Sequence, residues 1–320
     1  MSETIRNFKE NYQEYIDREI FPHLLNIDQF RKKYLKDFIV TVIVILATIA
    51  GIIYYLITSE TEINNFIFGI LVFIGLVMIL AVYTPIGMYQ RKTKGSIMPR
   101  ITAFFEGLEH KQGNIVFTCI PNEIIRNSQI IPKFDLHNCD DSITGSYKGV
   151  TINIEETSLI KTSHMAGRQR RIPVFKGLII QLKTDKQFNG KTIILKDLGI
   201  INNFLKDKAR KLQNIKLQNH EFEKKFEVYT SDQQEAQDIL TDNFMQDLQK
   251  MSELFENAKL QMSLFDNNLF IAININKNLF EPASLFKSAL DTERVELVFR
   301  EIIQILNMIE ILKQNEKIGI

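Results

Sequence analysis

The chain has 320 residues, a formal net charge of +1 and two cysteines, Cys119 and Cys139. A net charge near zero excludes a generally basic nucleic-acid-binding protein, although it leaves room for a local basic patch. Two cysteines exclude a disulfide-rich secreted scaffold. At about 100 to 200 residues per domain, the length allows one large domain or two modest ones.

The N-terminal segment, residues 1–37, is highly polar, so no cleavable signal peptide is expected. Within it Tyr12, Ile16 and Ile20 recur at helix-like spacing. We predict a cytoplasmic helical segment here, with a break near Pro22, because proline lacks the N–H of a helical hydrogen bond.

Two long apolar runs follow, over residues 38–57 and 66–83, and neither contains a charged residue. About 20 helical residues, at about 1.5 Å each, cross the ~30 Å hydrocarbon core of a bilayer. Because only residues 58–65 separate the runs, the sequence predicts a transmembrane hairpin over residues 38–90. A pair of buried core helices is the alternative, and the length and lack of charge argue against it.

Basic residues flank the hairpin on both outer sides, while its loop carries Glu60 and Glu62 and no Lys or Arg. The flanking residues are Arg31, Lys32, Lys33, Lys36, Arg91, Lys92, Lys94 and Arg100. The positive-inside rule therefore places both termini in the cytoplasm. Since the spans hold no ionisable residue, we expect an anchor rather than a transport path, unless several hairpins assemble.

The remaining residues, 91–320, are predicted to form a cytoplasmic α+β domain. A helix is expected over 97–110, and strands over 143–147 and 150–155 surround a tight Lys148-Gly149 turn. Further strands are predicted over 174–182 and 192–195, with a turn at Phe188-Asn189-Gly190 between them.

The C-terminal part of this domain mixes capped helices with strands. A strand over 226–229 should precede a helix over 233–240, with Ser231 as N-cap and Gln234 completing a capping box. Thr241 is expected to cap a second helix over 243–257. Strands over 261–265 and 269–275 should form a hairpin around Asp266-Asn267-Asn268.

The last helix, predicted over residues 291–313, is the strongest periodic signal outside the two apolar runs. Its broad apolar face comprises Val295, Val298, Ile302, Ile305, Leu306, Ile309 and Leu312. This face is wide enough to be buried in the domain core. A helix–helix contact between copies of the chain is the functional alternative.

Several motifs resemble a bacterial two-pass membrane family catalogued only as a domain of unknown function, thirty-one thirty-seven in that series. They are Asp141-x-Ile143-x-Gly145, Tyr147-Lys148-Gly149, Phe175-Lys176-Gly177-Leu178, the block from Phe222 to Asp232, Glu235-Ala236, Leu240-Thr241 and Phe244-Met245. The polar N-terminal helix and the two-helix anchor are also similar, so the resemblance covers nearly the whole chain. It implies a protein of the bacterial inner membrane. It brings no established activity and no catalytic residues.

Signatures of catalysis are scarce. The sequence has no phosphate-binding loop and no nucleophile elbow. His220-Glu221 begins like a paired-histidine zinc helix, but Lys224 stands where the second histidine would be. We therefore expect no catalytic and no cofactor-binding residues, and a binding module is favoured over an enzyme.

A compact polar cluster is formed by His137, Cys139, Asp140 and Asp141, with Cys119 upstream. Such side chains can hold a metal, but their spacing matches no zinc module. Asp140-Asp141 also fits a polar turn before a strand. We therefore expect no metal site.

A basic segment contains Arg168, Arg170 and Arg171 within residues 161–173, which are predicted to be a loop joining two strands, and Lys176 follows. Near a membrane these residues would contact anionic lipid headgroups or a protein partner. A nucleic-acid partner is not expected, because no aromatic residues are interleaved with the charges. The simplest alternative is a solvated loop without a partner.

The sequence thus predicts an integral membrane protein of the bacterial inner membrane, multi-pass, with both termini in the cytoplasm. Its partners are expected to be the lipid bilayer and either a protein partner or further copies of the chain. The favoured function is a membrane-anchored binding or scaffold module at the cytoplasmic face. The alternatives are an enzyme with an unrecognised site for a lipid or nucleotide, and an oligomeric membrane assembly.

Overall fold

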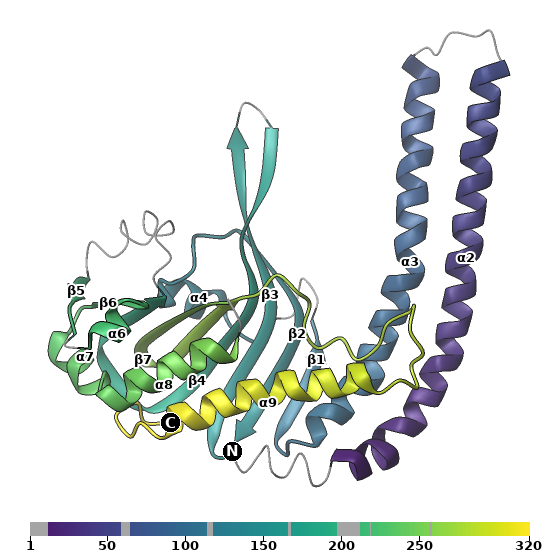
Figure 1. Ribbon diagram of the computed structural model, residues 1–320. Helices are drawn as coiled ribbons and strands as arrows, with labels where there is room; N and C mark the ends of the chain where they lie inside the picture. Colours follow the sequence, from purple (N-terminus) through teal and green to yellow (C-terminus); the bar gives the residue numbers. More distant parts are fainter. Residues whose placement is uncertain are drawn as a thin grey trace. The chain divides into compact units, whose positions relative to one another are not determined.

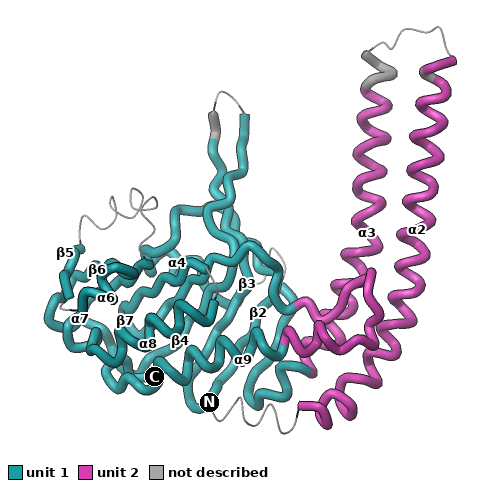
Figure 2. Tube along the Cα trace, viewed as in Figure 1, with its two compact units in different colours: residues 1–11, 101–280, 299–320 teal, residues 12–100, 281–298 magenta. Residues whose placement is uncertain are grey.

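The computed structural model describes residues 12–58, 65–113, 118–165, 168–196, 212–217, 219–255 and 258–320. Of the expected link between the two apolar spans, residues 58–65, residues 59–64 lie outside these described residues. The described chain divides into two compact units, shown in separate colours in Figure 2. Unit 2 consists of residues 12–100 and 281–298, and unit 1 consists of residues 101–280 and 299–320.

Unit 2 is built on two long helices, α2 (Phe21–Thr58) and α3 (Asn65–Ala103), which run side by side in Figure 1. A π-helical turn, η1 (Ile16–Ile20), leads directly into α2. The predicted break at Pro22 is therefore wrong. Pro22 lies in the first turn of α2, and the N–H of Phe21 bonds to the carbonyl of Ile16, so a wider turn absorbs the proline without interrupting the helix.

The helix predicted over 97–110 ends earlier than expected, because α3 stops at Ala103 and a strand, β1 (Leu108–Gln112), follows. The backbone reverses at Glu106 and Gly107, which have φ values of 32° and 81°. Gly107 also accepts a hydrogen bond from the N–H of Ser146, which fixes the turn against the neighbouring strand.

Among its described residues, unit 1 contains a seven-stranded antiparallel sheet in the order β1-β2-β3-β4-β6-β5, with β7 on the other edge of β4. The strands after β1 are β2 (Leu136–Tyr147), β3 (Val150–Met165), β4 (Arg168–Lys196), β5 (Gln213–Ile215), β6 (Phe226–Thr230) and β7 (Lys259–Asn274). The predicted Lys148-Gly149 turn between β2 and β3 is confirmed, and both of its residues have positive φ. The α+β class expected from the sequence is confirmed as well.

Two strands are longer than predicted. β4 continues through Phe188-Asn189-Gly190, and β7 continues through Asp266-Asn267-Asn268, so neither segment is the turn that the sequence suggested. Instead the register between the two strands shifts on both sides of the Phe188–Asp266 pair. Along its other edge β4 pairs first with β3 and then with β6.

Helices cover both faces of the sheet (Figure 1). On one face lie α4 (Asn122–Ser128) and the segment after it, which contribute to a buried cluster with β3, β4 and β7. That cluster comprises Ile120, Ile125, Ile130, Ile131, Phe134, Leu159, Phe175, Ile179, Ile193, Leu195, Phe265, Phe270 and Ala272. The opposite face is covered by α8 (Asp242–Leu254) and α9 (Glu293–Lys313).

The long C-terminal helix α9 matches the prediction closely. All seven residues of its expected apolar face are at most 1% exposed, which confirms the interpretation of this face as core. Tyr147 of β2 donates a hydrogen bond of 2.6 Å to Glu310 on the polar side of the helix.

Short capped helices connect β6 to β7. The N-cap of α7 (Gln233–Ile239) is Asp232, which accepts from the N–H of Glu235 at 3.0 Å. The predicted Ser231 cap is therefore wrong, because the Ser231 hydroxyl instead accepts from the N–H of Lys191 in β4. Thr241 caps α8 as predicted, and a single turn, α6 (His220–Glu223), precedes β6.

Candidate functional site

The basic residues singled out in the sequence lie on a β-hairpin arm formed by the end of β3 and the start of β4. The predicted loop over 161–173 is wrong, since its described residues pair in an antiparallel ladder from Lys161–Ile172 to Met165–Arg168. In Figure 1 the arm extends beyond the rest of the sheet. Residues 168–173 are all exposed, so the arm presents its side chains to the surroundings rather than to the core.

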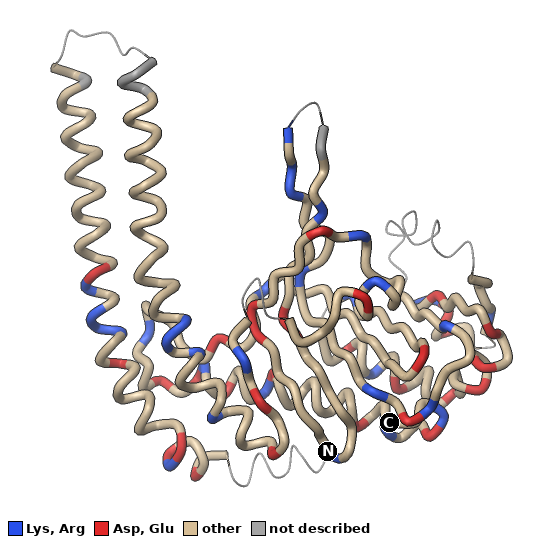
Figure 3. Tube along the Cα trace, turned by 180° about the vertical axis from the view of Figure 1, so that it is seen from behind, with Lys and Arg blue, Asp and Glu red and all other residues tan. Residues whose placement is uncertain are grey.

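The pairing register of β3 with β4 places basic side chains on both faces of the arm. Arg168 and Arg170 share one face with Lys161, because alternate residues of a strand and directly paired residues point the same way. Arg171 lies on the other face. No Asp or Glu occurs between residues 157 and 184, and Figure 3 shows the described part of the arm marked only by Lys and Arg.

Lys176, the fourth residue of the predicted site, is not part of the arm. A bulge between the Leu159–Phe175 and Ile160–Pro173 pairs separates the arm from the body of the sheet. Lys176 lies on the sheet side of this bulge and donates to Asn278 at 3.3 Å. The structure therefore brings three of the four predicted residues together.

A buried polar network, which sequence reasoning missed, lies between β2, β3 and the segment before α4. The Glu155 carboxylate is fully buried and accepts from the backbone N–H groups of Cys119 at 3.2 Å and Ile120 at 3.1 Å. Its other oxygen contacts Nε2 of His137, whose Nδ1 is 2.8 Å from Oδ1 of Asn122.

The network resembles the parts of a cysteine-nucleophile site, but its geometry is that of a structural core. Sγ of Cys119 faces the Glu155 carboxylate at 3.5 Å, not the His137 imidazole. Burial and the neighbouring Glu155 charge both raise the pKa of the Cys119 thiol, and the same causes raise that of Cys139. A thiolate nucleophile needs the opposite environment. No catalytic role is therefore assigned to this network.

A second buried pair joins β1 to β2, where Nε2 of His110 lies 2.7 Å from Oδ1 of Asp141. Asp140, Asp141 and Glu156 place carboxylate oxygens within 4.8 Å of one another. Asp141 is already bonded to His110, and Glu156 accepts from the N–H of Leu279 at 3.0 Å. His137, Cys119 and Cys139, which the sequence grouped with Asp140 and Asp141, belong instead to the separate network around Glu155.

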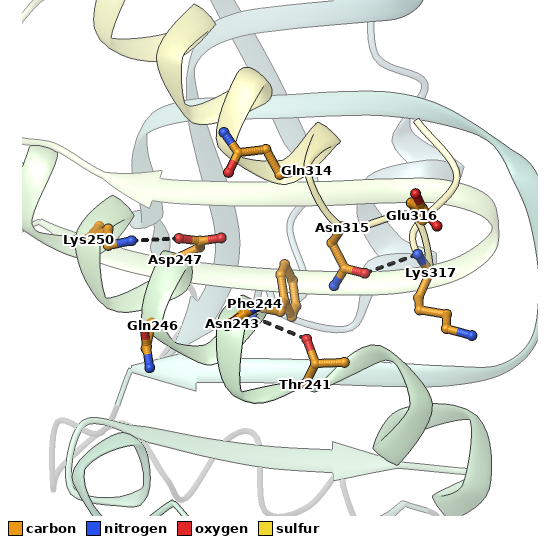
Figure 4. A pocket seen from close by; sticks show the side chains of 10 residues that line it. All are labelled: Thr241, Asn243, Phe244, Gln246, Asp247, Lys250, Gln314, Asn315, Glu316 and Lys317. Carbon is orange, nitrogen blue, oxygen red and sulfur yellow. Dashed lines mark hydrogen bonds and ion pairs between the residues drawn. The ribbon is translucent and has the colours of Figure 1, made fainter. Parts of the chain in front are cut away.

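One cavity of about 460 Å³ lies between the N-terminal half of α8 and the residues that follow α9 (Figure 4). Its lining is mostly polar, and the side chains drawn there include Thr241, Asp247 and Asn315. Thr241 is engaged in capping α8, Asp247 pairs with Lys250 at 2.9 Å, and Asn315 accepts from the N–H of Lys317. These groups bond to one another rather than converging on one point, so the cavity offers no catalytic constellation.

The surface of α2 and α3 is unusual for helices of a water-soluble protein. Both are long and apolar enough to cross a membrane, and none of the first apolar window and only 6% of the second is buried. The hydroxyls of Thr41, Thr48 and Thr84 each donate to the carbonyl four residues earlier, at 2.8 Å. Polar groups satisfied within the helix are what a hydrocarbon environment requires.

The family model described as "Protein of unknown function (DUF3137)" matches residues 173–314. This match confirms the predicted resemblance to that family over these residues. It begins at Pro173 in β4 and ends just after α9, so it covers a smaller part of the chain than the sequence motifs suggested.

No curated protein sequence matches the chain. A solved structure, the crystal structure of the mycobacterial trehalose monomycolate transport factor A (TtfA), aligns with 69% of this chain and 96% of that chain. The two sequences are 9% identical over the alignment, and the TM-score is 0.36.

Proposed function

We propose that this protein is an integral membrane protein of the bacterial inner membrane whose unit 1 acts as a binding or scaffold module at the cytoplasmic face. The observation that carries the proposal is the combination, in one chain, of two exposed apolar helices with a folded domain that bears an exposed basic arm. A minimal anchor and a large polar domain are typical of a protein that holds a binding surface near a membrane.

The orientation follows from the charges beside the helices. Basic residues precede the apolar part of α2 and follow that of α3, and the loop between them has no Lys or Arg. Positive charge near the ends of a span is retained on the cytoplasmic side. Both termini, and with them unit 1, are thereby assigned to the cytoplasm, where the inner leaflet supplies anionic lipid.

We assign the arm to anionic lipid headgroups. Each basic residue near such a surface contributes about 1 kcal/mol, so the three that share one face of the arm, Lys161, Arg168 and Arg170, together supply about 3 kcal/mol. That energy corresponds to a preference of roughly a hundredfold for an anionic over a neutral surface. Since the interaction is electrostatic, it should weaken as salt is raised.

The arm is tested with the full chain in nanodiscs of neutral lipid or of neutral and anionic lipid. The chain contains no tryptophan, so Ile172→Trp, at an exposed arm position, gives a single fluorescent reporter. We expect its emission to move to shorter wavelength in anionic nanodiscs and to return on adding salt. The change should disappear when Arg168, Arg170 and Arg171 are replaced by Glu.

A matched control replaces three other exposed lysines of unit 1, Lys224, Lys225 and Lys250, by Glu. The net charge changes equally, and the ion pairs removed are exposed and contribute little. If the control and the arm variant lose the anionic response equally, the effect is general attraction and the arm is not the contact.

The scaffold role itself is tested by crosslinking in native membranes, followed by mild-detergent purification and measurement of the particle mass. A stoichiometric protein partner or a defined homo-oligomer is expected. A monomer without partner in native membranes would overturn the scaffold role and favour the enzyme alternative. Reporter fusions at both termini and in the 59–64 link check the orientation separately.

A further inference from the structure

Within unit 2, a loop formed by residues 282–291 packs against α2 and α3, although it lies far from both helices in the sequence. Asp28 of α2 accepts hydrogen bonds from the N–H of Ala289 at 3.1 Å and from the hydroxyl of Ser288 at 3.4 Å. At the start of the loop, Lys94 of α3 forms an ion pair of 2.8 Å with Glu281. These contacts hold the loop against both helices.

The loop has one face packed and one face open. Leu285 and Ala289 are buried, whereas Phe286 is 59% exposed. The ring of Phe286 meets the ring of Phe38 edge to face, with centroids 5.3 Å apart. Beside α2, a large aromatic side chain is therefore exposed over more than half of its surface.

The position of Phe38 along α2 indicates how deep in a membrane the Phe286–Phe38 contact would lie. Phe38 is the first residue of the apolar run over residues 38–57, and Lys36 and Asp37 come directly before it. Twenty helical residues at about 1.5 Å each match the ~30 Å hydrocarbon thickness, so Phe38 falls at its boundary. The neighbouring residues Ile39 and Val40 are 48% and 49% exposed, so the open side of Phe286 continues an apolar surface.

We propose that the 282–291 loop is a membrane-interface element, in which Phe286 inserts beside Phe38 at the boundary between lipid headgroups and acyl chains. This inference rests on the proposed function, because it requires α2 to span the bilayer. Aromatic side chains favour this boundary. The loop would hold the chain that leads into α9 at a fixed depth, so that α2, α3 and the C-terminal part of unit 2 share one membrane level.

The absence of native tryptophan allows a direct depth measurement with single-tryptophan variants of the full chain. Phe286→Trp probes the loop, and Lys287→Trp, at a neighbouring exposed position, is a second probe should the first variant fail to fold. Phe73→Trp reports the middle of the second apolar run, where Phe73 is 67% exposed. Gln246→Trp, at an exposed position of α8, is the aqueous control.

Each variant is reconstituted in bilayers whose lipids carry bromine either near the headgroups or near the ends of the acyl chains. We expect the loop probe to emit at shorter wavelength than the Gln246→Trp probe and to be quenched most by the shallow bromine. The Phe73→Trp probe should be quenched most by the deep bromine.

The outcomes separate the two proposals. If the Phe73→Trp probe is quenched and neither loop probe is, the loop faces water or a protein partner, and the inference is wrong while the anchor stands. If the loop probes respond most to the deep bromine, the interfacial depth is wrong. If the Phe73→Trp probe is not quenched either, α3 does not span the bilayer and the proposed function fails first.

Discussion

Phe188 of β4 and Asp266 of β7 are paired across the sheet at the one point where their ladder is irregular on both sides. Phe188 is 4% exposed, and Asp266 has a φ of 52° in the left-handed region. On either side of this pair the strands resume a regular antiparallel ladder, from Gly177–Asn274 to Lys183–Asn268 and from Thr192–Leu264 to Leu195–Gln261. The pair therefore marks a bulged irregularity within two continuous strands.

The backbone at Asp266 gives a prediction about side-chain shape. We expect Asp266→Val to lower the free energy of unfolding by about 1–2 kcal/mol, because a left-handed backbone crowds the Cβ of an L-residue and β-branching adds to the crowding. Asp266→Gly should change it by less than about 0.5 kcal/mol, because the relieved strain offsets the added backbone entropy of the unfolded chain. Denaturant unfolding of the full chain in detergent measures both.

Asn267→Val is the matched control for this prediction. Asn267 is exposed, adjacent in β7, and is not among the described residues with positive φ. The same β-branched substitution should cost less there than at Asp266. Equal losses of stability at the two positions would show that the cost of valine does not come from the left-handed backbone.

The same irregularity shows why part of the fold could not be predicted from the sequence. Asn189-Gly190 and Asp266-Asn267-Asn268 have the local chemistry of turns. The course of Asn189 and Gly190 within β4 depends on a distant group, since Glu235 of α7 accepts from their N–H groups at 3.2 and 2.9 Å. Such contacts become visible only once the sheet has assembled.

Features decided within a few residues were predicted correctly. The Lys148-Gly149 turn, the Thr241 cap and the apolar face of α9 depend on local backbone preferences or on helical period. The candidate site was predicted in part, because its arginines were identified although their arrangement as a β-arm was not. The pairing of His137 with Glu155 joins two strands, and the single signal for it was two adjacent glutamates inside a strand pattern.

Two glycines provide a prediction that separates backbone strain from steric contact. Gly177 has a φ of 147°, and a Cβ there would lie 2.2 Å from the carbonyl oxygen of Ile273. Gly149 has a φ of 86°, with nothing within 4 Å of the added atom. We expect Gly149→Ala to cost about 1 kcal/mol from strain alone and Gly177→Ala about 3 kcal/mol or more, because overpacking against backbone adds to the strain.

Thermal unfolding of the two alanine variants, with expression yield as a second readout, tests this order. The larger loss should appear at Gly177, which lies opposite Asn274 in the β4–β7 ladder. If Gly149→Ala were the more damaging change, the close approach of β4 and β7 at Gly177 would not be the constraint that the structure indicates.

The environment of the two cysteines predicts slow thiol chemistry. Burial and the Glu155 charge raise the pKa of both thiols, so little thiolate is present at pH 8. We expect a maleimide to modify Cys119 and Cys139 far more slowly than a cysteine introduced at the exposed arm position Gln169, as followed by intact mass. Both native thiols should react readily after denaturation. Labelling of Cys119 in the folded chain as fast as at Gln169→Cys would contradict the buried network.

Because the Asp28 carboxylate holds the 282–291 loop, we predict that this loop loses order in acid. Burial of Asp28 raises its pKa, but hydrogen bonds from Arg31, from the N–H of Ala289 and from Lys32 outweigh this and lower it to about 2. A carboxyl whose folded pKa is lowered stabilises the fold above its unfolded value, 3.8 here, and this contribution is lost as the pH falls towards 2. Hydrogen exchange of the loop, corrected for its intrinsic pH dependence, should therefore accelerate between those pH values and stay constant above about 5.

At neutral pH, Asp28→Asn should reproduce the acid effect, because the amide can still accept from Ala289 but no longer attracts Arg31 and Lys32. We expect the local free energy of opening of the loop to fall by about 1–3 kcal/mol, as for other buried hydrogen bonds to charged groups. Trypsin cleavage after the exposed Lys287 should accelerate in parallel. Asp17→Asn, an exposed change in the adjoining η1 turn, is the control and should leave the cleavage rate unchanged. A loop equally protected in the Asp28→Asn variant would mean that Phe286 and the Lys94–Glu281 pair hold it without the carboxylate.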